Sequence, residues 1–237
     1  MSTQSNKPVC VVVGVGPGNG AAYARRYTAE GYQVALLARR LTFTAELANT
    51  LDGARAYACD VCDIHSVETT FEAIHTELGD IEVLIYNPGA GIWADVEEIS
   101  FDDFEQSWRV NTFGALLTSR QVIASMKSND KGNIIFIGAT ASRRGGAKMA
   151  AFASAKAAQK SLSESMARHL GPAGIHVSLI IVDGVVDTPA TRKMMPDKAN
   201  DYFIQPDDLA DVAMNLTRQK RSTWSSVIEV RPYAEVW

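Results

Sequence analysis

The stretch Pro8-Val9-Cys10-Val11-Val12-Val13 leads directly into Gly14-Val15-Gly16-Pro17-Gly18-Asn19-Gly20. The first part is continuously apolar, which is typical of a strand buried on both faces of a sheet. The second part holds four glycines in seven residues, and a predicted helix over 21–30 follows it. Glycines between a strand and a helix let the backbone approach a pyrophosphate, whose charge the helix amino end favours. The stretch therefore predicts a dinucleotide-binding loop.

The next apolar run, 33–38, ends in Arg39 and Arg40, with no carboxylate at this strand end. In dinucleotide-binding folds an acidic residue here holds the ribose hydroxyls of NAD, whereas an arginine suits the 2′-phosphate of NADP. The two arginines therefore predict NADP(H) as the preferred cofactor, with NAD(H) possible. The alternative is a pair of solvated loop arginines.

Strand and helix patterns alternate along the rest of the chain, with no internal repeat and no linker. Helical connections between successive strands imply right-handed crossovers. The fold class predicted is therefore α/β, a single-domain Rossmann-type doubly wound parallel sheet of about seven strands flanked by helices, over residues 1–237. The further predicted strands are 54–59, 81–86, 133–137, 176–182 and 226–230, and the main further predicted helices are 41–51, 63–78, 101–126 and 206–218.

Composition excludes several classes of partner. The net charge of the 237-residue chain is −4, and no basic block is present, so no nucleic-acid partner is expected. The first seven residues are polar, and no stretch approaches the ~20 apolar residues of a membrane span, so no membrane partner is expected. Three cysteines cannot form a closed disulfide framework, which favours a reduced, cytoplasmic location.

Cys59 and Cys62 form a Cys-x-x-Cys pattern with His65 close behind. No second pair completes a four-ligand zinc site, so we expect no metal and interpret the cysteines as packing residues. Asp60 lies between them at a predicted strand end, where its carboxylate can accept a hydrogen bond from the adenine amino group.

With these landmarks, the chain resembles the short-chain dehydrogenase/reductase family over essentially its full length. The spacing Gly14-x3-Gly18-x-Gly20 resembles the family's cofactor loop, and Phe152-x3-Lys156 resembles its active-site helix. Asn111 and Asp60-Val61 also lie where the family pattern expects them. The resemblance, together with the loop chemistry, implies that a small-molecule substrate is bound beside the cofactor. The cofactor-binding residues expected are Gly14, Gly16, Pro17, Gly18, Asn19, Gly20, Arg39, Arg40, Asp60, Val61, Asn87, Gly89, Lys156, Gly184, Val186 and Thr188.

Two departures from the family pattern bear on mechanism. In the family, a tyrosine four residues before the lysine is the general acid/base, and a serine thirteen residues before that tyrosine holds the substrate oxygen. Here these positions are Phe152 and Ala139, neither of which has a hydroxyl. Asn111 and Lys156 remain. This pattern resembles a divergent natural subgroup with phenylalanine in place of the tyrosine.

The first functional hypothesis is an NADPH-dependent reductase with an atypical active site, acting on a small carbonyl, imine or activated C=C substrate. Asp183 is the first candidate for its proton donor, since burial near the nicotinamide would raise the pKa of a carboxyl group. The alternative role for Asp183 is to cap its loop through local amides. The expected catalytic residues are then Asn111, Lys156 and Asp183, and the expected substrate pocket holds Ala139, Thr140, Arg143 and Phe152.

Two further classes of function stay open at this point. The loss of both hydroxyls is also compatible with a cofactor-binding pseudoenzyme or a partner-binding protein on the same scaffold. A lyase, isomerase or dehydratase without net redox change is the third possibility. Arg143 and its neighbour Arg144 either favour an anionic substrate, if one points inward, or are solvated.

Two segments predict a lid and an interface. Residues 190–205 are polar, contain methionines and lie between two prolines, which predicts an adaptable substrate lid. The C-terminal residues 231–237 are rich in aromatics, which is unusual for a free tail. By resemblance to the family we expect a homodimer or homotetramer, in which this tail packs.

Overall fold

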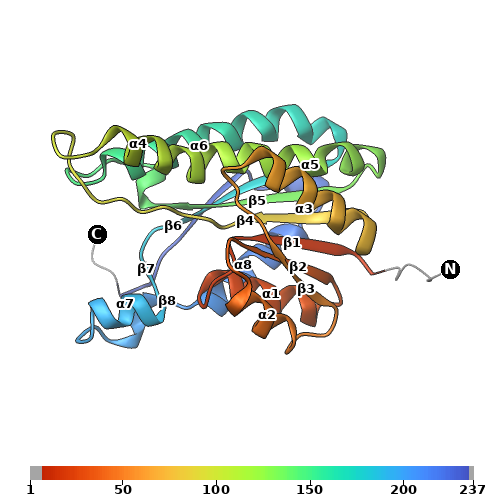
Figure 1. Ribbon diagram of the computed structural model, residues 1–237, viewed down its shortest axis with the longest axis horizontal. Coiled ribbons are helices and arrows are strands. Elements are labelled where there is room, and N and C mark those ends of the chain that lie inside the picture. The colour runs from red at the N-terminus through yellow and green to blue at the C-terminus, as the bar shows by residue number, and fades with distance from the viewer. Residues whose placement is uncertain (1–6, 235–237) are drawn as a thin grey trace.

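A computed structural model describes residues 7–234 as a three-layer α/β structure (Figure 1). The central sheet has seven parallel strands in the order β3-β2-β1-β4-β5-β6-β9. This confirms the predicted fold class. The chain reverses its direction of travel across the sheet between β1 and β4, and the carboxyl ends of these two strands form the edge at which such folds bind ligands.

The strands are short, apolar and mostly buried, as expected for a parallel sheet covered on both faces. Their bounds are β1 Val9–Val13, β2 Gln33–Ala38, β3 Ala54–Ala58, β4 Ile81–Tyr86, β5 Gly132–Ala139, β6 Ile175–Val182 and β9 Val227–Val230. Each lies within two residues of a predicted strand.

Helices connect the strands in the expected order, and side-chain caps begin several of them. The Ser100 hydroxyl accepts a hydrogen bond from the Asp103 amide and so caps α4. The helices are α1 Asn19–Ala29, α2 Leu41–Ala48, α3 Ile64–Glu77, α4 Phe101–Trp108, α5 Gly114–Ser128, α6 Ala150–Leu170, α7 Pro189–Met194 and α8 Pro206–Thr217. Short 3-10 turns cover Thr140–Ser142, Gly171–Ala173, Asn200–Tyr202 and Arg221–Thr223.

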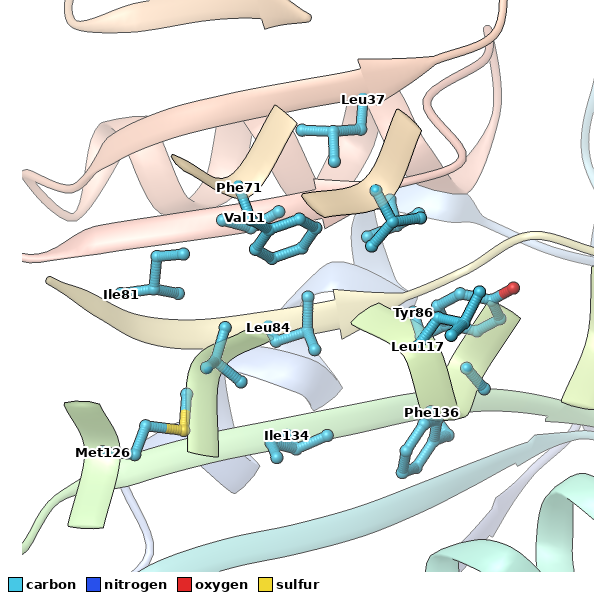
Figure 2. Close-up of a cluster of buried hydrophobic side chains, with 14 of the residues drawn as sticks. Val11, Leu37, Phe71, Ile81, Leu84, Tyr86, Leu117, Met126, Ile134 and Phe136 are labelled. Atoms are coloured by element: carbon cyan, nitrogen blue, oxygen red, sulfur yellow. The ribbon is translucent and has the colours of Figure 1, made fainter. Parts of the chain in front are cut away.

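Two apolar layers hold the sheet, because alternate strand residues face opposite sides. One layer lies under α3, α5 and α6, where Phe71 contacts the sheet beside Val11 and Met126 lies near Ile134 (Figure 2). The other lies under α1, α2 and α8, where Tyr23 and other apolar side chains are buried. Both faces are therefore closed, which leaves the strand ends as the place for a site.

The predicted helix over 101–126 is interrupted, which corrects the sequence-based assignment. A π-helical turn, η1 (Arg109–Phe113), separates α4 from α5. Two backbone carbonyls of this turn bond to side chains from elsewhere in the fold. The Tyr86 hydroxyl donates to the Val110 carbonyl oxygen, and the Gln159 amide donates to that of Asn111. These hydrogen bonds to other elements thus satisfy carbonyl groups of the π-helical turn. Such turns are frequent at functional sites.

The segment after β6 is more ordered than a simple loop. A two-stranded parallel sheet joins β7 (Val185–Val186) to β8 (Phe203–Ile204), and α7 lies between them. Arg192 binds both carboxylate oxygens of Asp187 and packs over the ring of Phe203. These contacts hold residues 189–204 together as one unit. Its role as a lid stays a prediction.

Some predictions concern the chain ends. Residues 1–6 and 235–237 lie outside the described part, so the predicted packing of the C-terminal tail is described only as far as residue 234. There, the Tyr233 hydroxyl donates to Asp201, which links the tail to the segment before β8. In residues 7–234, no helix is long and apolar enough to cross a membrane.

Candidate active site

The glycine loop fits between two other loops with almost no spare room. Gly14 has a φ of +80°, and a Cβ atom there would lie 2.8 Å from the Pro88 nitrogen. A Cβ on Gly18 would lie 2.8 Å from the Thr188 side chain, and one on Gly20 would lie 2.6 Å from the Val15 Cα atom. Any side chain at these three positions would displace a neighbour, whereas Gly16 has open space around it.

A cleft of about 910 Å³ opens beside this loop, at the carboxyl ends of the first four strands. The Asn87 side chain fixes one wall, because its Nδ2 atom donates to the Gly14 carbonyl oxygen at 2.8 Å. The cleft brings together most of the residues predicted to bind a cofactor. Those that line it are Gly14, Gly16, Pro17, Arg39, Arg40, Asp60, Val61, Asn87 and Gly89.

Charges divide this cleft into distinct regions. Arg39 and Arg40 are exposed at its rim, and within residues 7–234 neither guanidinium forms a salt bridge. The Asp60 carboxylate accepts the Cys62 amide at 3.0 Å, which fixes it at the cleft wall. Cys59 and Cys62 do not form a disulfide bond. Among the described residues, no three His, Cys, Asp or Glu side chains form a metal-binding group.

Asn111 is fully buried in the π-helical turn. Its Nδ2 atom donates to the Ser107 carbonyl oxygen at 2.8 Å and to that of Ala90 at 3.3 Å. Its Oδ1 atom has no hydrogen-bond partner among residues 7–234 and lies 3.9 Å from the position of a Cβ atom on Gly89, a cleft residue. A buried acceptor without a donor is costly, so this oxygen is available to a ligand that carries an N–H or O–H group. The Oδ1 atom of Asn19 is buried without a partner as well.

Lys156 is buried on α6 and makes three hydrogen bonds. Its Nζ atom donates to the Ile137 carbonyl oxygen at 2.8 Å, to Oε1 of Gln159 at 3.2 Å and to the Pro88 carbonyl oxygen at 3.5 Å. Burial lowers the pKa of Lys156 from 10.5 to about 7, because the ammonium loses its hydration. Within residues 7–234 it has no carboxylate partner that would offset this loss. Lys156 therefore changes charge near neutral pH.

The end of the site near Phe152 has no hydroxyl at the two positions where the family pattern has one. The Phe152 ring packs against Trp93 with their centroids 5.5 Å apart. Ala139 ends β5, and its amide donates to the Ser142 hydroxyl. This end therefore presents aromatic and methyl surface.

Asp183 does not have the environment expected of a proton donor, which corrects that prediction. It is buried, yet its carboxylate accepts hydrogen bonds from Thr140, at 2.5 Å, and from Arg231. Burial alone would raise the pKa of Asp183, but the hydrogen bonds from Thr140 and Arg231 and the Arg231 charge together lower it. The group is thus an ionised carboxylate held by Thr140, which follows β5, and by Arg231, which follows β9.

The remaining predicted residues surround this end. Arg143 is exposed and forms a salt bridge with Glu229 of β9. Gly184 links β6 to β7, and Val186 pairs with Ile204. Thr188 caps α7 by accepting the Thr191 amide, while its methyl group faces Gly18. The post-β6 loop thus contacts the glycine loop directly.

The predictions from sequence did not include two residues of the site, Gln159 and Trp93. Gln159 binds Lys156, and its position three residues further along the same helix places it on the same face. Trp93 contacts Phe152 from the loop after β4, and no sequence pattern indicates this contact.

Comparison with known proteins identifies the class. Residues 8–199 match the family described as short chain dehydrogenase. The chain belongs to this family, which confirms the expected oxidoreductase class. A curated relative is the 3-oxoacyl-(acyl-carrier-protein) reductase MabA of Mycobacterium bovis, 30% identical over 81% of this chain and 77% of the relative. Another is the 3-oxoacyl-(acyl-carrier-protein) reductase of Bos taurus, 29% identical over 78% of each chain.

Solved structures have the same fold as this chain. A metagenomic short-chain oxidoreductase in complex with NADP has a TM-score of 0.83 and 26% identity, over 96% of this chain and 98% of that one. An actinorhodin polyketide ketoreductase with NADPH has a TM-score of 0.86 over 98% of each chain; at 22% identity it supports the fold alone.

The cleft of this chain fits a nicotinamide dinucleotide on its own features. Gly16 has open space around it and lines the cleft just before the start of α1, where a pyrophosphate would face the amino end of that helix. Within the described residues, the arginines at the rim form no salt bridge, and the buried side-chain oxygens of Asn19 and Asn111 have no hydrogen-bond donor.

The lowered pKa of Lys156 predicts a pH-dependent stability. Between pH 7 and 10.5 the unfolded chain binds a proton at this lysine that the folded protein does not, so the free energy of unfolding rises with pH through this window. In Lys156→Met, which retains most of the side-chain volume, this rise should be lost. Urea denaturation of both proteins at several pH values measures the difference.

The control is Lys160→Met, which alters a lysine of the same helix that pairs with Glu164. It should keep the wild-type pH dependence. Parallel curves for wild type and Lys156→Met would contradict the expectation.

Proposed function

We propose that the protein is an NADPH-dependent reductase with an atypical active site, acting on a small carbonyl, imine or activated C=C compound. One contrast supports this: the glycine loop and the two rim arginines line a cleft, while the positions of the two family hydroxyls hold Phe152 and Ala139. The cofactor preference is supported by Arg39 and Arg40, and by the neighbouring structure that contains NADP.

When bound, the cofactor supplies a hydride. The residues of this chain would hold it: Arg39 and Arg40 would pair with the 2′-phosphate, the amides near Gly18 would bind the pyrophosphate, and Lys156 and Asn111 would serve the nicotinamide end. The packed rings of Phe152 and Trp93 would present an apolar surface to the substrate. A site of this kind orients its substrate by shape and does not protonate it from a tyrosine.

This division of the site favours substrates that need little help from an acid. A simple ketone acquires alkoxide charge as hydride arrives, and a general acid contributes roughly 10²–10⁴-fold to such a step. An iminium ion requires no proton, and an activated C=C bond can be protonated later from water. These substrates therefore fit the site better than a simple ketone.

A cofactor-binding pseudoenzyme is the alternative, and the same two residues, Phe152 and Ala139, favour it. Both proposals require NADPH to bind. They differ in whether NADPH is consumed when imines, enones and ketones are supplied. Tight binding without consumption of NADPH across these classes would support the pseudoenzyme.

Arg39 should determine the choice of cofactor. A charge-assisted hydrogen bond of about 1.5–3 kcal/mol to the 2′-phosphate corresponds to roughly 10- to 150-fold in affinity. Arg39→Asp should therefore weaken NADPH binding by this amount and leave NADH binding nearly unchanged, as measured by fluorescence titration. The control is Arg25→Asp. Arg25 lies on α1 and pairs with Asp207 of α8. Equal losses for both cofactors in Arg39→Asp would refute the phosphate contact.

Restoring the two hydroxyls should restore ketone chemistry. In the double variant Phe152→Tyr and Ala139→Ser, a phenol stands one helical turn before Lys156 and a hydroxyl ends β5. We expect the rate of simple ketone reduction to rise ~100-fold, with NADPH affinity unchanged. Phe152→Leu, which adds no hydroxyl, should give no gain. If the wild type already reduces ketones as fast as the double variant, the proposed substrate preference is wrong.

We also propose that the protein forms a homo-oligomer through α4. Phe101, Phe104 and Trp108 recur at helical spacing and are exposed, Phe101 by 95%, so they form one apolar face. A second copy of the chain would cover it. Phe104→Glu should lower the mass in sedimentation to that of a smaller assembly, while Ile64→Glu, at an exposed position of α3, should not. An unchanged mass for Phe104→Glu would count against this interface.

A further inference from the structure

Gln159 is a fully buried amide with both ends engaged. Its Nε2 atom donates to the Asn111 carbonyl oxygen at 2.9 Å, and its Oε1 atom accepts from Nζ of Lys156 at 3.2 Å. The opposite roles of the two ends fix the orientation of the amide, because a flipped group would place oxygen against oxygen. One side chain therefore bridges the π-helical turn and the buried lysine.

The wide turn η1 creates the need for this bridge. The carbonyl of Asn111 faces α6 at full burial, where a missing donor would be costly. Val110, the preceding residue, has its carbonyl satisfied by the Tyr86 hydroxyl from β4. Gln159 supplies the corresponding donor from α6. A second tie between the same elements runs from the Thr112 hydroxyl to the Ala155 carbonyl oxygen at 2.8 Å.

At Lys156, the bridge completes a set of three acceptors. Ile137 receives one hydrogen bond at the end of β5, and Pro88 receives another, at 3.5 Å, in the loop that forms the cleft wall. Gln159, which also binds η1, receives the third at 3.2 Å. Each of the three Nζ hydrogen bonds thus has an acceptor that the fold supplies. The longest one goes to Pro88, a residue that lines the cleft.

No charged group contributes to this arrangement in the described part of the chain. The strand β5 and the loop at Pro88 present carbonyl oxygens, η1 presents the uncharged Asn111, and α6 presents Gln159. The amide of Gln159 is thus the side chain that binds the amino group, and its replacement by a charged or an apolar group should change the balance between the two protonation states of Lys156.

We infer that Gln159 is a positioning residue: it holds Lys156 as a fixed hydrogen-bond donor toward the cofactor cleft. An amide donates and accepts hydrogen bonds but does not release a proton at neutral pH, so the bridge opens no proton path from Lys156 to η1. Phe152, on the same helix, likewise offers no proton. The functional part of this inference rests on the proposed function, whereas the bridge itself is a property of the cofactor-free protein.

The test measures the titration of Lys156 directly in the cofactor-free protein. Lysines labelled with ¹³C at Cε are followed by NMR across pH 6–11, and Lys156→Met identifies the Lys156 signal. Gln159→Glu places a carboxylate beside Nζ and should move the Lys156 midpoint upward by about one pH unit or more. Gln159→Leu, which removes the acceptor at similar volume, should move the midpoint downward. Ser163→Ala, which removes a buried hydroxyl of the same helix that bonds to the Lys160 carbonyl oxygen, should leave it unchanged.

A second measurement separates positioning from simple support of the fold. If Gln159 serves only to tie α6 to η1, thermal stability falls in both Gln159 variants while the Lys156 midpoint stays at its wild-type value; that result overturns the inference. In fluorescence titrations, Gln159→Leu should weaken NADPH binding several-fold, whereas Ser163→Ala should not. If wild type binds NADPH but turns over no substrate, the reductase proposal fails while the effect on Lys156 stands.

Discussion

The close contact between the glycine loop and the loops around Pro88 and Thr188 is the constraint on which the site depends. A side chain on Gly14, Gly18 or Gly20 would clash within 2.9 Å of a neighbour, and the Asn87 amide ties the first of these glycines to the end of β4. Loops from three strands are thereby held together. This close approach is possible because glycine has no side chain at the contact points.

A second constraint concerns polar groups that are out of contact with water. The π-helical turn leaves carbonyl groups facing the core, and the buried Lys156 needs acceptors, so each requires a partner from another element. Tyr86 and Gln159 provide these partners. The packing of α6 against η1 is therefore specified by hydrogen bonds as well as by apolar contacts.

Together these features separate binding from proton transfer. The cofactor cleft retains its glycines, its rim arginines and its buried amides. The substrate end instead presents Phe152, Trp93 and Ala139, and the nearby carboxylate of Asp183 is already bound to Thr140 and Arg231. Under the proposed function, such a site would orient its ligands, and protons would come from the substrate or from water.

The sequence by itself determined the alternation of strands and helices, the sheet type and the cofactor loop, since these follow from local patterns of apolar residues and glycine. It also indicated the positions of Arg39, Asn111 and Lys156. Only the tertiary structure decided what these side chains touch. Arg231, nearly fifty residues from Asp183, lowers the pKa of that carboxyl group, and Gln159 acquires its role from a turn that lies 48 residues earlier in the chain. Burial and long-range partners set the chemistry of a buried group, and neither can be deduced from neighbouring residues in the chain.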